Sequence, residues 1–137
     1  MGMMTTDPEP YVCLLPVLPP SLNVWRHWHW GKQNKERNIF QGALMAVLNE
    51  KGNKCPRGLE AVELHAVLFF PTKRGRDSDN YAAVLWKWVQ DELVNEGIIP
   101  DDTADRCTAH APKMLQGPEG TMLLISPRIE SRVEGTK

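Results

Sequence analysis

The stretch AVELHAVLFF, residues 61–70, decides the fold class of this 137-residue chain. From Val62 to Phe70 every second side chain is apolar, and Glu63 and His65 lie between the first of them. A period of two is typical of a β-strand that buries one face. A proline follows directly, and we expect the strand to end there because proline cannot donate to a sheet ladder.

Two stretches on either side of this strand have the period of an amphipathic helix. In residues 35–49 the apolar side chains recur at the spacing of one helical stripe, at Phe40, Ala43, Leu44, Val47 and Leu48. Residues 81–96 repeat the pattern at Leu85, Val89 and Leu93. Gly97 follows, and glycine is the usual residue after the end of a helix. We therefore expect two main helices.

The remaining apolar stretches are short and rich in strand formers. They predict strands at residues 11–17, 106–111 and 121–126. Residues 21–34 have no clean period, so we expect a loop there. The resulting order is β-α-β-α-β-β, which predicts an α+β fold with two main helices on a small mixed sheet.

Length and composition indicate one ordinary globular domain. We place it at residues 11–127, between flexible tails at residues 1–10 and 128–137. No apolar run approaches the roughly 20 residues of a membrane span, and the N-terminus lacks the features of a secretory signal. An odd number of widely spaced cysteines is typical of buried, reduced thiols; they are Cys13, Cys55 and Cys107. We therefore expect a cytoplasmic protein without a membrane segment.

Charge is distributed unevenly along the chain, although the net charge is only −1. Residues 21–57 hold seven basic and two acidic side chains, whereas residues 77–105 hold eight acidic ones and a single lysine. A metal site beside a track for phosphates would give this pattern. Two ordinary solvated faces would give it as well.

Acidic residues flank the second predicted helix. RDSDN at residues 76–80 precedes it, and GIIPDD at residues 97–102 follows it. Mg²⁺ prefers carboxylate oxygens and keeps waters for a substrate phosphate. If residues 77–79 are extended, Asp77 and Asp79 point to the same side, and an acid from beyond the helix could complete a site. The structural alternative is that one of these aspartates caps the helix and that the second motif is a turn.

The order of these motifs resembles the RusA family of Holliday-junction resolvases. That family's pattern is a strand, PPSxN with an aromatic-Arg step, a helix, a strand, DxDN, a helix with a lysine, and GxxxDD. This chain has PPSLN at residues 19–23 with Trp25 and Arg26, DSDN at residues 77–80, and GIIPDD at residues 97–102. The resemblance covers nearly the whole expected domain.

The resemblance implies an endonuclease that resolves Holliday junctions or related branched DNA in recombination and repair, as a homodimer and with Mg²⁺, which Mn²⁺ can replace. It implies metal ligation by Asp77, Asp79 and Asp102, and a phage or prophage source fits the family. Two alternatives stay open. The chain could cleave other branched structures such as flaps, or it could be a DNA-binding module whose catalysis has decayed.

The lysine is where the sequence departs from the family. The family lysine lies four residues after the second aspartate of DxDN, where this chain has Ala83. Counted back from Gly97, Lys87 stands at the right distance before Asp91, as though one helical turn had been inserted. Either the helix begins late, so that Lys87 still reaches the acids, or the role of the lysine is reduced or lost. We expect the first, with Lys87 as a catalytic residue.

Basic and aromatic residues supply candidate contacts to DNA. Those expected at phosphates are Arg26, Lys73, Arg74 and Arg76, together with Asn80 of the DxDN motif. Trp25, Trp28 and Trp30 could stack on unpaired bases, and packing in the core or in a dimer is the alternative. His27 and His29 have no third ligand near them in sequence, so we expect polar loop residues rather than metal ligands.

Overall fold

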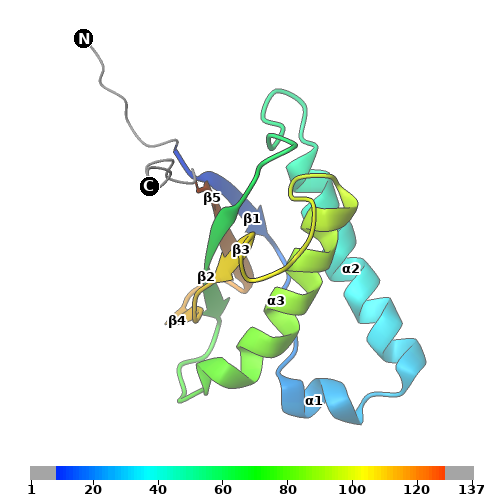
Figure 1. Ribbon diagram of the computed structural model, residues 1–137. Coiled ribbons are helices and arrows are strands. Elements are labelled where there is room, and N and C mark those ends of the chain that lie inside the picture. The colour runs from blue at the N-terminus through cyan, green and yellow to red at the C-terminus, as the bar shows by residue number, and fades with distance from the viewer. Residues whose placement is uncertain (1–8, 129–137) are drawn as a thin grey trace.

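Five strands and three helices make up residues 9–128, the part of the chain that the computed structural model describes (Figure 1). In chain order they are β1 (Tyr11–Leu15), α1 (Leu22–His27), α2 (Trp30–Leu48), β2 (Val62–Phe70), α3 (Ser78–Asn95), β3 (Cys107–Ala109), β4 (Lys113–Gln116) and β5 (Gly120–Pro127). The mixture of helices with one mixed sheet confirms the α+β prediction. Most of the two predicted tails, residues 1–8 and 129–137, lies outside the described residues.

The sheet has the order β1-β5-β2-β3, and β4 pairs with β2 beyond the end of β3. β5 is antiparallel to both of its neighbours, whereas β3 and β4 run parallel to β2. The alternation predicted for β2 is confirmed, because Val62, Leu64, Ala66, Leu68 and Phe70 are all buried. Glu63 and His65 therefore point to the opposite face of the sheet.

The two long helices cover one face of this sheet (Figure 1). The predicted stripe of α2 is confirmed by Phe40, Leu44 and Leu48, which are almost completely buried. α3 turns both Leu85 and Leu93 into the same core. Gly97 directly follows the cap of α3, as expected. Its φ of 74° is a backbone conformation that residues with a Cβ rarely adopt.

Residues 21–34 are largely helical, so the prediction of a loop there is wrong. Ser21 caps the six-residue α1 by accepting a hydrogen bond from the backbone N–H of Val24, at 3.2 Å. The Nδ1 atom of His29 caps α2 by accepting from the N–H of Gly31, at 3.1 Å. α2 therefore begins at Trp30, five residues earlier than expected. A helix as short as α1 shows too few turns for its period to be visible.

β4 is a second element that the sequence did not predict. Three of its four residues are exposed, so it lacks a regular alternation of apolar and polar side chains. It exists because its backbone pairs with the end of β2, where Val67 aligns with Lys113 and Phe70 with Gln116.

The cysteines match the expectation of buried free thiols. Cys13, Cys55 and Cys107 are all buried, and none forms a disulfide. Burial raises the pKa of Cys13 to about 12 and the pKa of Cys107 to about 11. Among the described residues, no helix is long and apolar enough to cross a membrane.

Candidate functional site

The first acidic motif lies at the N-terminal end of α3. Asp77 has an extended backbone and is the N-cap of the helix, where its carboxylate accepts a hydrogen bond from the N–H of Asp79, at 3.0 Å. The helix begins at Ser78, so the condition that residues 77–79 are extended is not met, and the alternative that one of the aspartates caps the helix is confirmed. Asp77 and Asp79 are nevertheless both exposed. Two carboxylates next to the positive end of a helix dipole are electrostatically stabilised there.

A short basic turn leads into this helix. Lys73, Arg74 and Arg76 line a hollow of about 370 Å³ together with Phe70 and Gln116. The guanidinium of Arg76 lies 4.0 Å from the centre of the Phe70 ring and donates to the backbone oxygen of Thr72, at 3.1 Å. Its Nε atom is buried without a hydrogen-bond partner among the described residues. The aromatic ring and the Thr72 carbonyl therefore fix the direction of one positive charge beside Asp77.

The PPSLN motif at the start of α1 and the DSDN motif at the start of α3 meet in space. The side-chain oxygen of Asn80 accepts a hydrogen bond from the backbone N–H of Asn23, at 3.2 Å. Asn80 therefore joins the start of α3 to the start of α1, a structural contact that its predicted role at DNA did not anticipate. Arg26 lies exposed in the last turn of α1.

The three tryptophans near α1 have different surroundings. Trp25 packs against the core, while Lys32 lies over the ring of Trp28, 4.8 Å from the ring centre. Trp30 is 68% exposed. Of the three, Trp30 is the one whose ring is open to an external partner.

The second acidic motif lies beside the C-terminal half of α3. Asp102 is exposed, and it lines a hollow of about 410 Å³ with Arg37, Gln41 and Asp91. Asp101 forms a local turn by accepting hydrogen bonds from the hydroxyl and the N–H of Thr103, which hold the pKa of Asp101 below its usual value.

The two acidic motifs are separated by most of the length of α3. Asp102 shares its hollow with Asp91, which lies fourteen residues after the N-cap Asp77. At 1.5 Å per residue, this places the two ends of the proposed metal site roughly 20 Å apart along the helix axis. Among residues 9–128, no group of three metal-binding side chains includes any of the three aspartates. The set Asp77, Asp79 and Asp102 therefore does not fit one ion within a single chain.

Lys87 lies on the exposed surface of α3. Its ammonium pairs with Asp91 at 3.4 Å, and its side chain is 69% exposed. The expectation that α3 begins late is wrong, because the N-cap at Asp77 starts a regular helix at Ser78. Lys87 therefore lies about 12 Å beyond Asp79 along the helix axis. Its partner Asp91 lines the same hollow as Asp102.

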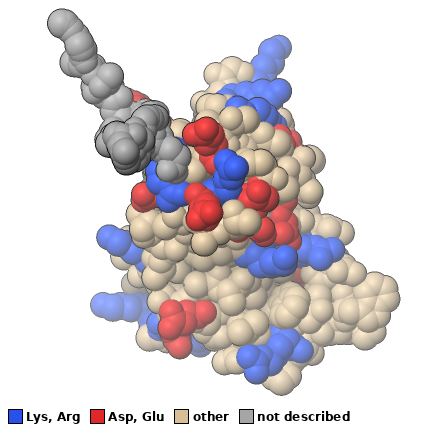
Figure 2. Space-filling view, viewed as in Figure 1, with Lys and Arg blue, Asp and Glu red and all other residues tan. Residues whose placement is uncertain are grey.

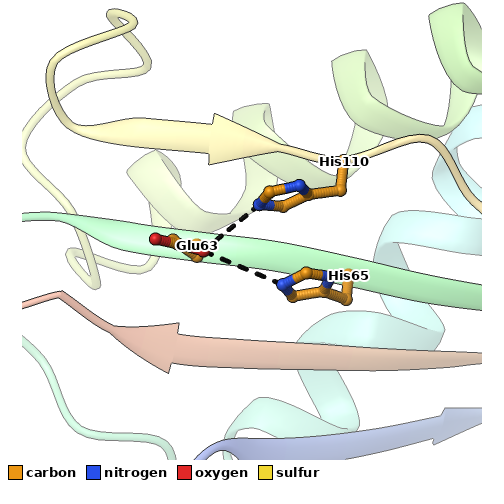
Figure 3. A group of neighbouring side chains, drawn as sticks. All are labelled: Glu63, His65 and His110. Atoms are coloured by element: carbon orange, nitrogen blue, oxygen red, sulfur yellow. Dashed lines mark hydrogen bonds and ion pairs between the residues drawn. The ribbon is translucent and has the colours of Figure 1, made fainter.

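A different group of side chains does converge. Glu63, His65 and His110 bring one carboxylate oxygen and two imidazole nitrogens within 4.8 Å of one another (Figure 3). These three residues could hold a metal ion. Glu63 and His65 share a face of β2 by the strand period, which was visible in the sequence. His110 lies 45 residues after His65 and joins them only because β3 pairs with β2.

Charge is mixed on the side of the molecule that Figure 2 shows. Figure 2 shows acidic and basic side chains interspersed over the viewed side of the molecule. The division between a basic and an acidic half of the sequence is therefore less sharp on this face than along the chain.

No family model matches the chain, and no curated protein matches it. The resemblance to the RusA family therefore rests on the order and spacing of the motifs.

Proposed function

We propose that this chain is a metal-dependent endonuclease that hydrolyses phosphodiesters in branched DNA, with the four-way junction as its substrate. The observation that carries the proposal is the exposure of all three motif aspartates. None of Asp77, Asp79 and Asp102 forms an ion pair within residues 9–128. Exposed carboxylates without a cationic partner are suited to a hard divalent cation such as Mg²⁺ or Mn²⁺.

The basic turn supports a DNA substrate. Lys73, Arg74 and Arg76 line one hollow next to Asp77, and cations in such a place favour backbone phosphates. Arg26 lies exposed on α1, whose first turn is joined to the start of α3 by the hydrogen bond between Asn23 and Asn80. A nucleic acid at the start of α3 would meet this positive charge beside the exposed carboxylates of Asp77 and Asp79.

The separation of the acids favours a homodimer. Asp77 and Asp102 lie roughly 20 Å apart along α3, so a site that uses both would take Asp102 from a second copy. Cleavage would then require a dimer. Lys87 of the second copy would lie near the Asp102 that this copy contributes.

The first experiment measures cleavage of a labelled four-way junction with Mg²⁺. Asp77→Asn, Asp79→Asn and Asp102→Asn each remove cleavage and leave junction binding, because each keeps its shape and lowers repulsion from phosphates. Asp105→Asn is the matched control, since Asp105 is an exposed acid in the same loop as Asp102 and keeps wild-type cleavage. A wild-type chain that binds junctions and cuts no branched DNA would contradict the nuclease proposal.

Co-expression tests whether the site is shared between copies. In a mixture of Asp77→Asn and Asp102→Asn chains, half of the dimers are mixed, and one of their two shared sites is intact. Cleavage then returns to about a quarter of the wild-type level, as nicks in one strand. If each site lies within one chain, the mixture stays inactive.

The second candidate is a junction-binding module without nuclease activity. The observation that favours it is the pairing of Lys87 with Asp91, which occupies the lysine in the isolated chain. Junction binding without cleavage in Mg²⁺ and in Mn²⁺ would support this candidate.

A further inference from the structure

The group formed by Glu63, His65 and His110 lies on the sheet face opposite the helices. Glu63 and His65 point outward from β2, and His110 directly follows β3. The backbone N–H of His110 donates to the oxygen of Leu64, at 3.0 Å, which aligns His110 with the two β2 side chains. The site is therefore built on β2 and on the end of the edge strand β3 that pairs with it.

The side chains point toward one another (Figure 3). The Nε2 atom of His110 lies 3.2 Å from Oε1 of Glu63, and the Nε2 atom of His65 lies 3.8 Å from the same oxygen. The two imidazole rings stack with centroids 4.1 Å apart and an angle of 6° between their planes. Both rings thus present the same nitrogen to one carboxylate.

These separations suit ligands of one transition-metal ion. Zinc binds imidazole nitrogen and carboxylate oxygen at about 2.0 to 2.2 Å, so two of its ligand atoms lie at most about 4.3 Å apart. The rings must turn out of their parallel stack for both nitrogen lone pairs to point at one ion, and the side chains have room to turn because they are 40–47% exposed.

We propose that Glu63, His65 and His110 bind one divalent transition-metal ion, of the class of Zn²⁺, through two imidazoles and one carboxylate. Imidazole nitrogen favours such an ion over Mg²⁺, which prefers oxygen ligands. Three protein ligands on an open face leave a coordination position for water or for a group of a bound molecule. The site is separate from the aspartates of α3 and does not depend on the proposed nuclease activity.

The experiment titrates Zn²⁺ into the untagged full-length chain by calorimetry, with Mg²⁺ as the comparison ion. The chain has four histidines, so the double variant His27→Ala/His29→Asn retains only the two imidazoles of the site. Asparagine at position 29 preserves a helix cap for α2. This variant is the control and binds Zn²⁺ as the wild type does.

The site variants are Glu63→Gln, His65→Asn and His110→Asn. Each weakens Zn²⁺ binding by more than the roughly 10- to 100-fold that loss of an outer partner of a ligand costs. Circular dichroism without metal checks that each variant is folded, and the isosteric Glu63→Gln decides the matter if a histidine variant fails to fold.

Co²⁺ gives an independent measurement through its absorption spectrum. Binding at the proposed site gives the bands of nitrogen and oxygen ligands, and they disappear in Glu63→Gln. A thiolate charge-transfer band would place the ion at a cysteine and overturn the proposal. Zn²⁺ affinity that is unchanged in all three site variants, or no Zn²⁺ binding by the wild type, would overturn it as well.

Discussion

Asp77 has an observed structural role and a proposed catalytic one, and a pair of substitutions can separate them. Its carboxylate caps α3 through the 3.0 Å hydrogen bond from the N–H of Asp79, and it is a proposed metal ligand. Asparagine retains an oxygen that accepts the capping hydrogen bond and removes the charge. Alanine removes both the cap and the charge.

The expected stabilities follow from this geometry. Loss of an N-cap costs about 1 kcal/mol, so Asp77→Ala lowers the free energy of unfolding by about that amount. Asp77→Asn keeps the cap and loses only the interaction of the charge with the helix dipole, which contributes roughly 0.3 to 1 kcal/mol at an exposed position. Both variants therefore stay folded, and alanine is the less stable of the two.

The expected activities do not follow the stabilities. Both variants lose junction cleavage equally, because both lack the charge that would bind the metal ion. Urea unfolding gives the stabilities, and single-turnover cleavage of a four-way junction gives the rates. Cleavage by Asp77→Asn at near the wild-type rate would show that Asp77 is only a helix cap.

Three further predictions concern α3 and its surroundings. Burial, followed by the neighbouring Glu96, raises the pKa of Glu92 to about 7 from 4.5; the folded protein therefore loses stability as the pH rises from 4.5 to 7. A glutamine at position 92 does not titrate. The Glu92→Gln protein is therefore more stable than the wild type by about 1 kcal/mol or more at pH 8, and by less at pH 5. A difference in stability that stays constant with pH in urea unfolding would contradict this prediction. Arg57 donates a hydrogen bond to the backbone oxygen of Glu96 and pairs with the Glu96 carboxylate, both at 3.0 Å. Arg57→Ala therefore lowers the free energy of unfolding by about 1 to 3 kcal/mol, measured as a lower melting temperature, and Arg57→Lys restores little of this loss. Lys87→Ala changes stability by less than about 0.5 kcal/mol, because its pair with Asp91 is exposed, and it slows cleavage by roughly 10² to 10³; a rate within about threefold of the wild type removes Lys87 from the proposed site.

Local sequence determined the elements whose signals repeat over several residues. The alternation of β2, the stripe of Phe40, Leu44 and Leu48 on α2, and the glycine that ends α3 were all predicted and confirmed. Each signal depends on neighbours within one or two turns or on the pleat of one strand, so it can be read without knowledge of the fold. The α+β class followed from the order of these elements.

Tertiary structure decided where α1 and β4 form and which distant residues meet. α1 is joined to α3 by the hydrogen bond from Asn23 to Asn80 and packs Trp25 against the core, and β4 pairs through its backbone with β2. The length of α3 separates Asp77 from Asp102, although their motifs suggested one site. Parallel pairing of β2 with β3 brings His110 to Glu63 and His65, although no local pattern connects them. Strand pairing is a non-local interaction, because its partner and register depend on how the rest of the chain packs. Candidate ligand residues can therefore be named from a single sequence, whereas which of them lie close together cannot.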